Sequence, residues 1–168
     1  MMSLILRPFE YSDKDLLSEI NSDSSMATYE DWVAGEIDLD TELDGMVNQT
    51  SWNEVDSTNY FAIVVDDKAI GYIQATVHDY QQAEIGYYIV RSMAGNGYAS
   101  KALRKFIQLA FDNEIHRCYC HIDPRHTASI KVASKCGMKY EGTMMHSSQI
   151  RGEWSNDAIY AVIGEKQI

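Results

Sequence analysis

The sequence predicts an α/β (α+β) fold, in which helices flank a mixed sheet. After residue 60, apolar runs of strand length alternate with segments whose apolar residues recur at helical spacing. A glycine-rich turn joins one such strand, 83–90, to a helix that begins at Gly97. The chain has 168 residues, no repeat and no low-complexity linker, so we expect a single domain spanning 1–168.

The first sixty residues are expected to supply one strand and then helices. Residues 4–9 have the composition of a short strand. Ser12 and Asp15 have the spacing of a capping box, which predicts a helix after them. Residues 26–52 are expected to be helical, as one segment or two. The side chains expected to face inward there are Trp32, Val33, Ile37, Leu43, Met46 and Val47.

The middle of the chain is expected to be a hairpin followed by a strand, a turn and a helix. Residues 60–65 and 69–77 are predicted strands, joined by a turn at 66–68. Residues 83–90 form the next strand and 91–96 a turn. The helix that follows is predicted from the spacing of Ala99, Leu103, Phe106, Ile107 and Ala110.

The remaining residues are expected to add three strands and one short helix. Residues 117–122 are a strand, and 129–136 are a helix that Gly137 ends. Residues 138–146 and 158–163 are the last strands. The polar segment 147–156 is expected to link them.

The turn before the Gly97 helix is suited to binding a phosphate. Gly95 and Gly97 let the backbone approach an anion, and the helix N-terminus offers N–H groups and partial positive charge. The stretch is not a dinucleotide fingerprint, because Ser100 stands where a third Gly or Ala is needed, and no Gly-Lys-Ser/Thr tripeptide occurs. Two interpretations of this stretch remain: a pyrophosphate-binding loop of a different kind, or a tight turn that binds no ligand.

Several motifs, in order along the chain, resemble the GNAT superfamily of N-acetyltransferases. They are similar to its RimJ/RimL-like branch, which acetylates ribosomal-protein N-termini, spermidine and some antibiotics. The matching segments are 4–9, 84–89, 95–100, 123–129, 135–138 and 157–160. The resemblance implies the GNAT fold, a mostly antiparallel sheet of about seven strands that splays open between the fourth and fifth strands. It also implies acetyl-CoA as cosubstrate.

The same resemblance assigns a cofactor site. Main-chain N–H groups of the loop would bind the pyrophosphate, and strand residues before it would offer main-chain groups to the pantetheine. The assigned residues are Ile89, Val90, Arg91, Ala94, Gly95, Asn96, Gly97, Tyr98, Ala99, Ser100, His126, Ser129 and Lys135.

Glu84 and Ser129 are the candidate catalytic residues. Glu84 could relay a proton from the amine through water, or it could be an acceptor-binding charge or an exposed strand residue. Ser129 could hydrogen-bond the CoA sulfur or the pantetheine, or it could cap a helix. The chain departs from the family at His126, where Asn is usual, and at Ala133, where many members carry a general-acid tyrosine.

Metal chemistry and secretion are not expected. Four histidines show no HExxH pattern and no ligand spacing with cysteine; they are His78, His116, His121 and His146. The cysteines Cys118, Cys120 and Cys136 are odd in number and suit a reduced, cytoplasmic protein. The first residues lack the features of a signal peptide, and no apolar run is long enough to span a bilayer.

Charge is distributed unevenly along the chain. The formal net charge of −11 argues against a nucleic-acid partner. Between Lys14 and Lys68 there are fourteen Asp or Glu and no Lys or Arg, whereas basic residues gather later. Such a chain could hold a polyanionic cofactor in one half and attract a cation in the other. A solvated acidic surface is the alternative.

The expected activity is acetyl-CoA-dependent N-acetylation of a primary amine by direct transfer in a ternary complex. The acceptor is a protein N-terminus, a polyamine or a small-molecule amine, and the acidic first third favours a cationic one. The alternative is a noncatalytic acyl-CoA-binding sensor or scaffold, which the substitutions at His126 and Ala133 motivate. A nucleotide-binding domain is a third possibility. Monomer and homodimer both remain open.

Overall fold

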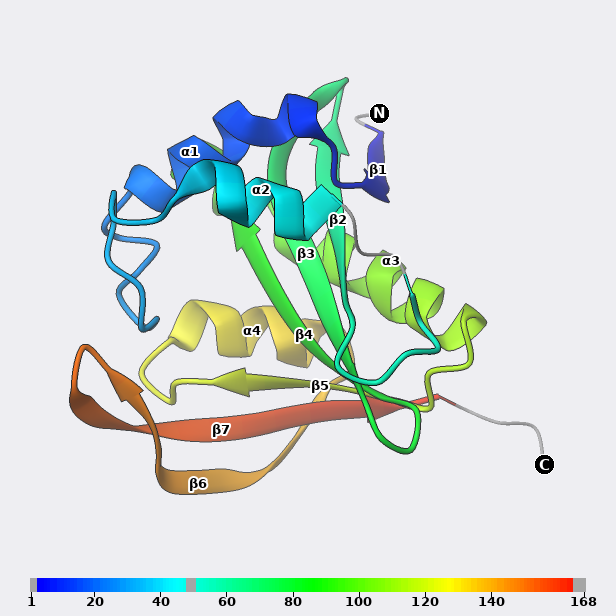
Figure 1. Ribbon diagram of the computed structural model, residues 1–168. Helices are drawn as coiled ribbons and strands as arrows, with labels where there is room; N and C mark the ends of the chain where they lie inside the picture. Colours follow the sequence, from blue (N-terminus) through cyan, green and yellow to red (C-terminus); the bar gives the residue numbers. More distant parts are fainter. Residues whose placement is uncertain (1–2, 48–50, 165–168) are drawn as a thin grey trace.

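The computed structural model describes residues 3–47 and 51–164. Its centre is a seven-stranded sheet in the order β1-β2-β3-β4-β5-β7-β6. The strands are β1 Leu4–Pro8, β2 Thr58–Val65, β3 Lys68–His78, β4 Gln82–Ile89, β5 Arg117–Ile122, β6 Lys139–Ile150 and β7 Glu153–Ile163. Neighbouring strands are antiparallel except β4 and β5, which are parallel. The predicted mixed, mostly antiparallel fold is therefore confirmed (Figure 1).

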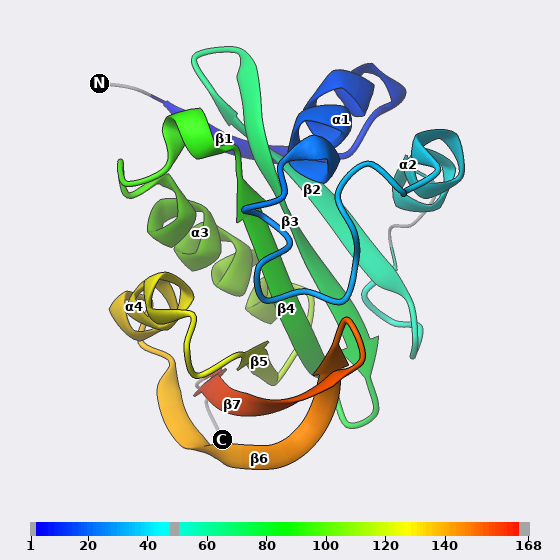
Figure 2. The same cartoon turned by 90° about the vertical axis from the view of Figure 1, so that its left-hand side faces the viewer.

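Helices cover both faces of the sheet. They are α1 Lys14–Ser22, α2 Leu39–Val47, α3 Tyr98–Asp112 and α4 Thr127–Lys135, with short 3₁₀ turns at Tyr11–Asp13 and Arg91–Met93. Figure 2 shows α1 and α2 on one face, with α3 and α4 on the other. The α3 side chains buried against the sheet are Ala102, Leu103, Phe106, Ile107 and Ala110, the stripe expected from helical spacing. None of the described helices has the length and apolarity to cross a bilayer.

The sheet opens between β4 and β5. These strands pair only at Gln82 with Arg117, Ala83 with Cys118 and Glu84 with Tyr119. Beyond Glu84, β4 runs on to Ile89 without β5 beside it, so its main-chain groups on that side lie outside the ladder. The splay expected from the sequence is therefore present, and the two strands diverge beyond Glu84 (Figure 1).

The far end of β4 is fitted closely against β3. Gly71 of β3 pairs with Ile89, and a Cβ at Gly71 would lie 2.1 Å from the carbonyl oxygen of Tyr88. The clashing atom belongs to the backbone, which cannot move aside as the end of a flexible side chain could. Position 71 therefore requires glycine. This contact fixes where the open end of β4 lies.

The capping box near the N-terminus lies two residues earlier than predicted. The N–H of Glu10 donates to the Asp13 carboxylate over 2.9 Å, and Asp13 is the residue before α1. The predicted pair, Ser12 and Asp15, was wrong because Arg7 on β1 selects Asp13. Both guanidinium nitrogens donate to that buried carboxylate at 2.7 Å.

Two other predicted segments were assigned incorrectly. Of residues 26–52, only α2 is helical; 26–38 are turns and bends with Val33 exposed, and 48–50 lie outside the described residues. Gly35 has a φ of +81°, and its N–H donates to the Asn21 carbonyl, so this segment folds back on α1 instead of continuing as a helix. Most of 147–156 is strand, since β6 and β7 meet in a tight turn at Arg151 and Gly152 with φ of +51° and +83°.

Candidate active site

The opening between β4 and β5 leads into a cavity of about 920 Å³. One side is formed by most of the segment 89–100, without Val90, Arg91, Ser92 and Asn96, and by the α4 residues that line the cavity; we call it the cofactor wall. The other side consists of residues 25–31 and the β6–β7 residues 148–157, and we call it the acceptor wall. Glu84 and His121 lie between them. A second cavity, of about 550 Å³ at the β3–β4 turn, contains none of the predicted site residues.

The loop before α3 has the backbone geometry of an anion site. Gly95 and Gly97 have φ of +79° and +77°, and a Cβ on either would meet nothing within 4 Å. Glycine is therefore required there by conformation and not by packing. The backbone hydrogen bonds of α3 begin with the N–H of Lys101, which donates to the Gly97 carbonyl over 3.1 Å. The backbone N–H groups that precede Lys101 therefore point out of the start of the helix. Asn96 stabilises the loop by donating to the Met93 and Ala94 carbonyls.

Most of the predicted cofactor residues line the cavity, and three do not. Those in the lining are Ile89, Ala94, Gly95, Gly97, Tyr98, Ala99, Ser100, His126, Ser129 and Lys135. Val90 is buried in the core, and Arg91 and Asn96 are exposed outside the lining. A cofactor role for any of these residues stays a prediction.

Ser129 is paired with a tyrosine from β4. The hydroxyl of Tyr87 lies 2.9 Å from the Ser129 hydroxyl and donates to the Ser129 carbonyl over 3.0 Å. Burial raises the pKa of Tyr87 well above its usual range, so its hydroxyl keeps its proton near neutral pH. Ser129 does not cap α4, because the N-cap residue is His126. Tyr87 was not among the predicted site residues, because its contact with Ser129 joins residues 42 positions apart.

Glu84 lies between two imidazoles. Its Oε1 is 3.2 Å from Nδ1 of His121, and its Oε2 is 3.7 Å from Nε2 of His78. The hydrogen bond with His121 is the main cause of a lowered Glu84 pKa and of a raised His121 pKa. From sequence alone, His121 was weighed only as a possible metal ligand. Alternation along β5 would place it on the same face as Tyr119, but only the β4–β5 register puts that face beside Glu84.

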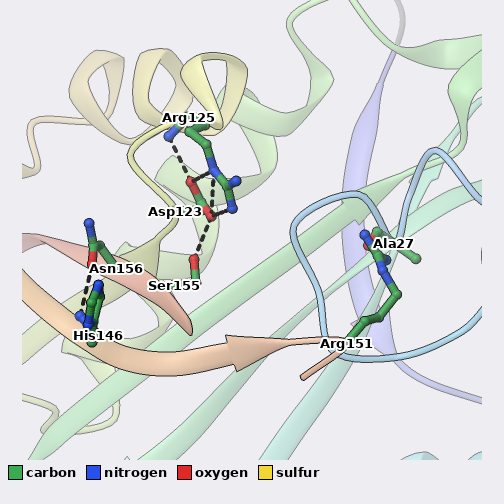
Figure 3. A network of polar contacts seen from close by, with 7 residues as sticks. All are labelled: Ala27, Asp123, Arg125, His146, Arg151, Ser155 and Asn156. Carbon is green, nitrogen blue, oxygen red and sulfur yellow. Dashed lines mark hydrogen bonds and ion pairs between the residues drawn. The ribbon is translucent and has the colours of Figure 1, made fainter. Parts of the chain in front are cut away.

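The turn between β5 and α4 is held by Asp123. Its buried carboxylate accepts hydrogen bonds from the Arg125 N–H at 2.8 Å, the Arg125 side chain at 2.6 Å and the Ser155 hydroxyl at 2.8 Å (Figure 3). The Arg125 bond is the main reason that the pKa of Asp123 falls to about 2. His126, next in the turn, stacks on Tyr29 with ring centroids 4.7 Å apart, and burial lowers its pKa. The start of α4, which belongs to the cofactor wall, is thereby joined to Tyr29 and Ser155 of the acceptor wall.

The acceptor wall is joined across a long stretch of sequence. At the tip of the β6–β7 hairpin, the N–H of Arg151 donates to the Asp31 carboxylate and its guanidinium donates to the Ala27 carbonyl, each over 2.9 Å. Figure 3 shows the Arg151 side chain reaching Ala27. The carboxyl groups of Glu30, Asp31 and Asp157 line the cavity on this side, and that of Glu84 lies between the two walls. Burial raises the pKa of Glu30 above the usual value of a glutamate.

Comparison with known proteins identifies the family. Residues 3–139 match the family model described as acetyltransferase (GNAT) domain. The chain belongs to the GNAT acetyltransferase family. This confirms the resemblance that the motifs predicted. Within the described residues, no group of three or more His, Cys, Asp or Glu side chains could hold a metal ion in this GNAT domain.

Similar GNAT proteins cover nearly the whole chain. The uncharacterized N-acetyltransferase YnaD of Bacillus subtilis is 26% identical over 97% of this chain and 95% of its own length. A solved RimL, a ribosomal L7/L12 alpha-N-protein acetyltransferase in complex with coenzyme A, has a TM-score of 0.84 at 19% identity, covering 96% of this chain and 94% of its own. Spermidine N-acetyltransferase from Vibrio cholerae, with CoA and spermine, has a TM-score of 0.81 at 17% identity and 95% coverage of each chain.

Proposed function

We propose that this protein transfers the acetyl group of acetyl-CoA to a primary amine, directly and within a ternary complex. The supporting observation is the opening between β4 and β5, which has an N–H-rich loop and Ser129 on one wall and carboxylates on the other. The cofactor-bound state of the similar RimL and spermidine acetyltransferase structures supports the same choice of acyl donor.

The cofactor wall supplies the groups that acetyl-CoA needs. The pyrophosphate would be bound by main-chain N–H groups of residues 94–100, at the positive end of the α3 dipole. The pantetheine would pair with main-chain groups of Ile89, which β5 leaves outside the ladder. The thioester would then lie near the Tyr87–Ser129 hydroxyl pair, which could hydrogen-bond the sulfur as it leaves as thiolate.

The acceptor wall favours a cationic amine. Ionised carboxylates such as Glu84, whose pKa is lowered, raise the local concentration of a cation and orient it toward the thioester. A protein N-terminus, a polyamine and a small amine all satisfy this chemistry. The amine must lose a proton before it attacks, and we place that step at the Glu84 end of the cavity.

We further infer that the chain acts as a single domain, as a monomer or homodimer, in a reducing cytoplasm. One sheet runs through the described residues, which supports a single domain. The three cysteines are unpaired, and Cys118 and Cys120 are buried, which supports a reducing compartment.

Thiol release from acetyl-CoA tests the proposed function. Purified protein is incubated with acetyl-CoA and a panel of amines: N-terminal peptides, polyamines, amino sugars and anionic amino acids. Free CoA is followed with a thiol reagent, and the acetylated product by mass spectrometry. We expect turnover with at least one cationic amine. Tight CoA binding by calorimetry without turnover of any amine would instead favour a noncatalytic acyl-CoA sensor, which the alanine at position 133 would then explain.

A further inference from the structure

We propose that His121 is the base that takes the amine proton and that Glu84 positions it. This inference rests on the proposed acetyl transfer and reassigns one role within it. Glu84 was the expected base, but its carboxylate is already committed to an imidazole that lines the same cavity. The pair has the arrangement of a base and its orienting acid.

The geometry selects one nitrogen of one histidine. A carboxylate only accepts hydrogen bonds, so the 3.2 Å contact between Oε1 of Glu84 and Nδ1 of His121 favours the tautomer that carries its proton on Nδ1. Nε2 is then the lone-pair nitrogen of the neutral ring. It has no hydrogen-bond partner among the described residues, and the side chain, which is 32% exposed, belongs to the cavity lining. His78 cannot act in its place, because its Nε2 is buried and lies beyond hydrogen-bond distance of Glu84.

The charged and titratable groups around His121 come from β3, β4, β5 and β7. Glu84 and, at longer range, Asp157 stabilise the imidazolium, whereas Arg117 and partial burial oppose it. Glu84 is the strongest influence, so the pKa of His121 is raised above its usual value. The other neighbouring groups are His78, beside Glu84, and Tyr119, whose ring centroid is 5.4 Å from that of His121.

These shifts make His121 the better base of the two. A general base is most effective when its pKa lies near the working pH, and a histidine shifted upward lies closer to neutrality than a carboxylate shifted downward. In the step itself, the ammonium gives one proton to Nε2, leaving a neutral amine and an imidazolium. The amine attacks the thioester carbon, its second proton passes to the departing thiolate, and the imidazolium returns its proton to solvent. Atoms and charge balance, with one proton released per turnover.

The first experiment titrates His121 directly by NMR of ¹⁵N-labelled histidine rings, without any substrate. We expect the His121 pKa to lie above the ordinary value of about 6.5, with Nδ1 protonated in the neutral form. In Glu84→Gln the His121 pKa should fall, because the anion that stabilises the imidazolium is gone. A His121 pKa that is unchanged by Glu84→Gln would overturn the pairing, whether or not the protein turns over any amine.

The second experiment compares rates across pH for an amine that the wild type acetylates. In wild type, kcat/KM should rise with pH through the His121 pKa, since the base must be neutral. Glu84→Gln should keep this rise but move it to lower pH, while His121→Gln should lose it and fall about 100-fold or more at neutral pH. His146→Gln is the matched control, because His146 is an exposed histidine outside the cavity lining, and it should match wild type.

The opposite pattern would return the base to Glu84. Near-complete loss in Glu84→Gln, with the pH dependence kept in His121→Gln, refutes the inference and leaves the acetyltransferase intact. Absence of turnover in the wild type removes the acetyltransferase proposal instead, and the NMR titration still decides whether the two residues are paired.

Discussion

The two walls of the cavity are built in different ways. The cofactor wall takes its shape from the backbone over short stretches: two glycines at positive φ, a helix start and the end of β4 that β5 leaves unpaired. The acceptor wall is assembled from segments about 120 residues apart, held by the Arg151 contacts to Asp31 and Ala27. The difference implies that the acceptor can change through side-chain substitutions while the cofactor site remains the same.

The largest effect should come from breaking the cofactor wall. Gly97→Val places a β-branched residue at a φ of +77°, which costs about 1–3 kcal/mol and drives the loop out of its anion-binding shape. We expect CoA affinity to fall about 5- to 150-fold by calorimetry.

Gly35→Val is the matched control for that variant. Gly35 has a φ of +81° and equally open surroundings, but it lies beside the acceptor wall. It should suffer comparable strain, visible as a lowered Tm, with CoA affinity within twofold of wild type. Equal losses of CoA affinity in both variants would show that the walls are not independent.

A smaller effect should come from the hydroxyl pair at the start of α4. Tyr87→Phe removes one hydrogen bond to Ser129 but keeps the ring, so kcat should fall about 3- to 10-fold while CoA binding is kept.

Tyr88→Phe, on the neighbouring residue, removes the hydroxyl that faces Glu30. It should alter the KM for the amine and leave kcat nearly unchanged. Stopped-flow and steady-state rates separate the two, and an unchanged kcat in Tyr87→Phe would exclude a role for the pair in transfer.

The smallest effect should come from loosening the acceptor wall. Arg151→Ala removes the guanidinium bond to Ala27 but keeps the main-chain bond to Asp31. The KM for the amine should rise about fivefold, matching the loss of about 1 kcal/mol, with CoA affinity unaffected. Arg151→Lys, which can still donate to Ala27, should recover part of the loss. A change in CoA affinity instead would mean that the hairpin tip contributes to both walls.

The same contrast explains what the sequence could predict. The strand–loop–helix around Gly95 and Gly97 was placed correctly, because glycine conformation and helix starts are local properties. Residues 26–38 were taken for helix, because turn conformation there depends on Asn21 and on a hairpin far along the chain. The turn at Arg151 was missed because it is exposed and polar, so the β6–β7 strands show little apolar alternation.

The residues of the candidate site also fall into those that local sequence could predict and those that depend on distant parts of the chain. Ser129 and most of the loop residues reach the cavity as the motifs predicted. Tyr87 and His121 could not be found, because both become significant only through partners that β4 register or helix packing brings to them. Glu84 was predicted as a site residue, but its neighbours His121 and His78 were not. Those two histidines lower the pKa of Glu84.

The tight fit at Gly71 has a consequence for how this protein can vary. Adding a single methyl group there would collide with the Tyr88 carbonyl and displace the strand end that borders the cavity. Mutational tolerance should therefore be lowest at a position that no ligand approaches. An engineer who seeks new acceptors can vary the side chains of the acceptor wall around Arg151, but must keep glycine at position 71.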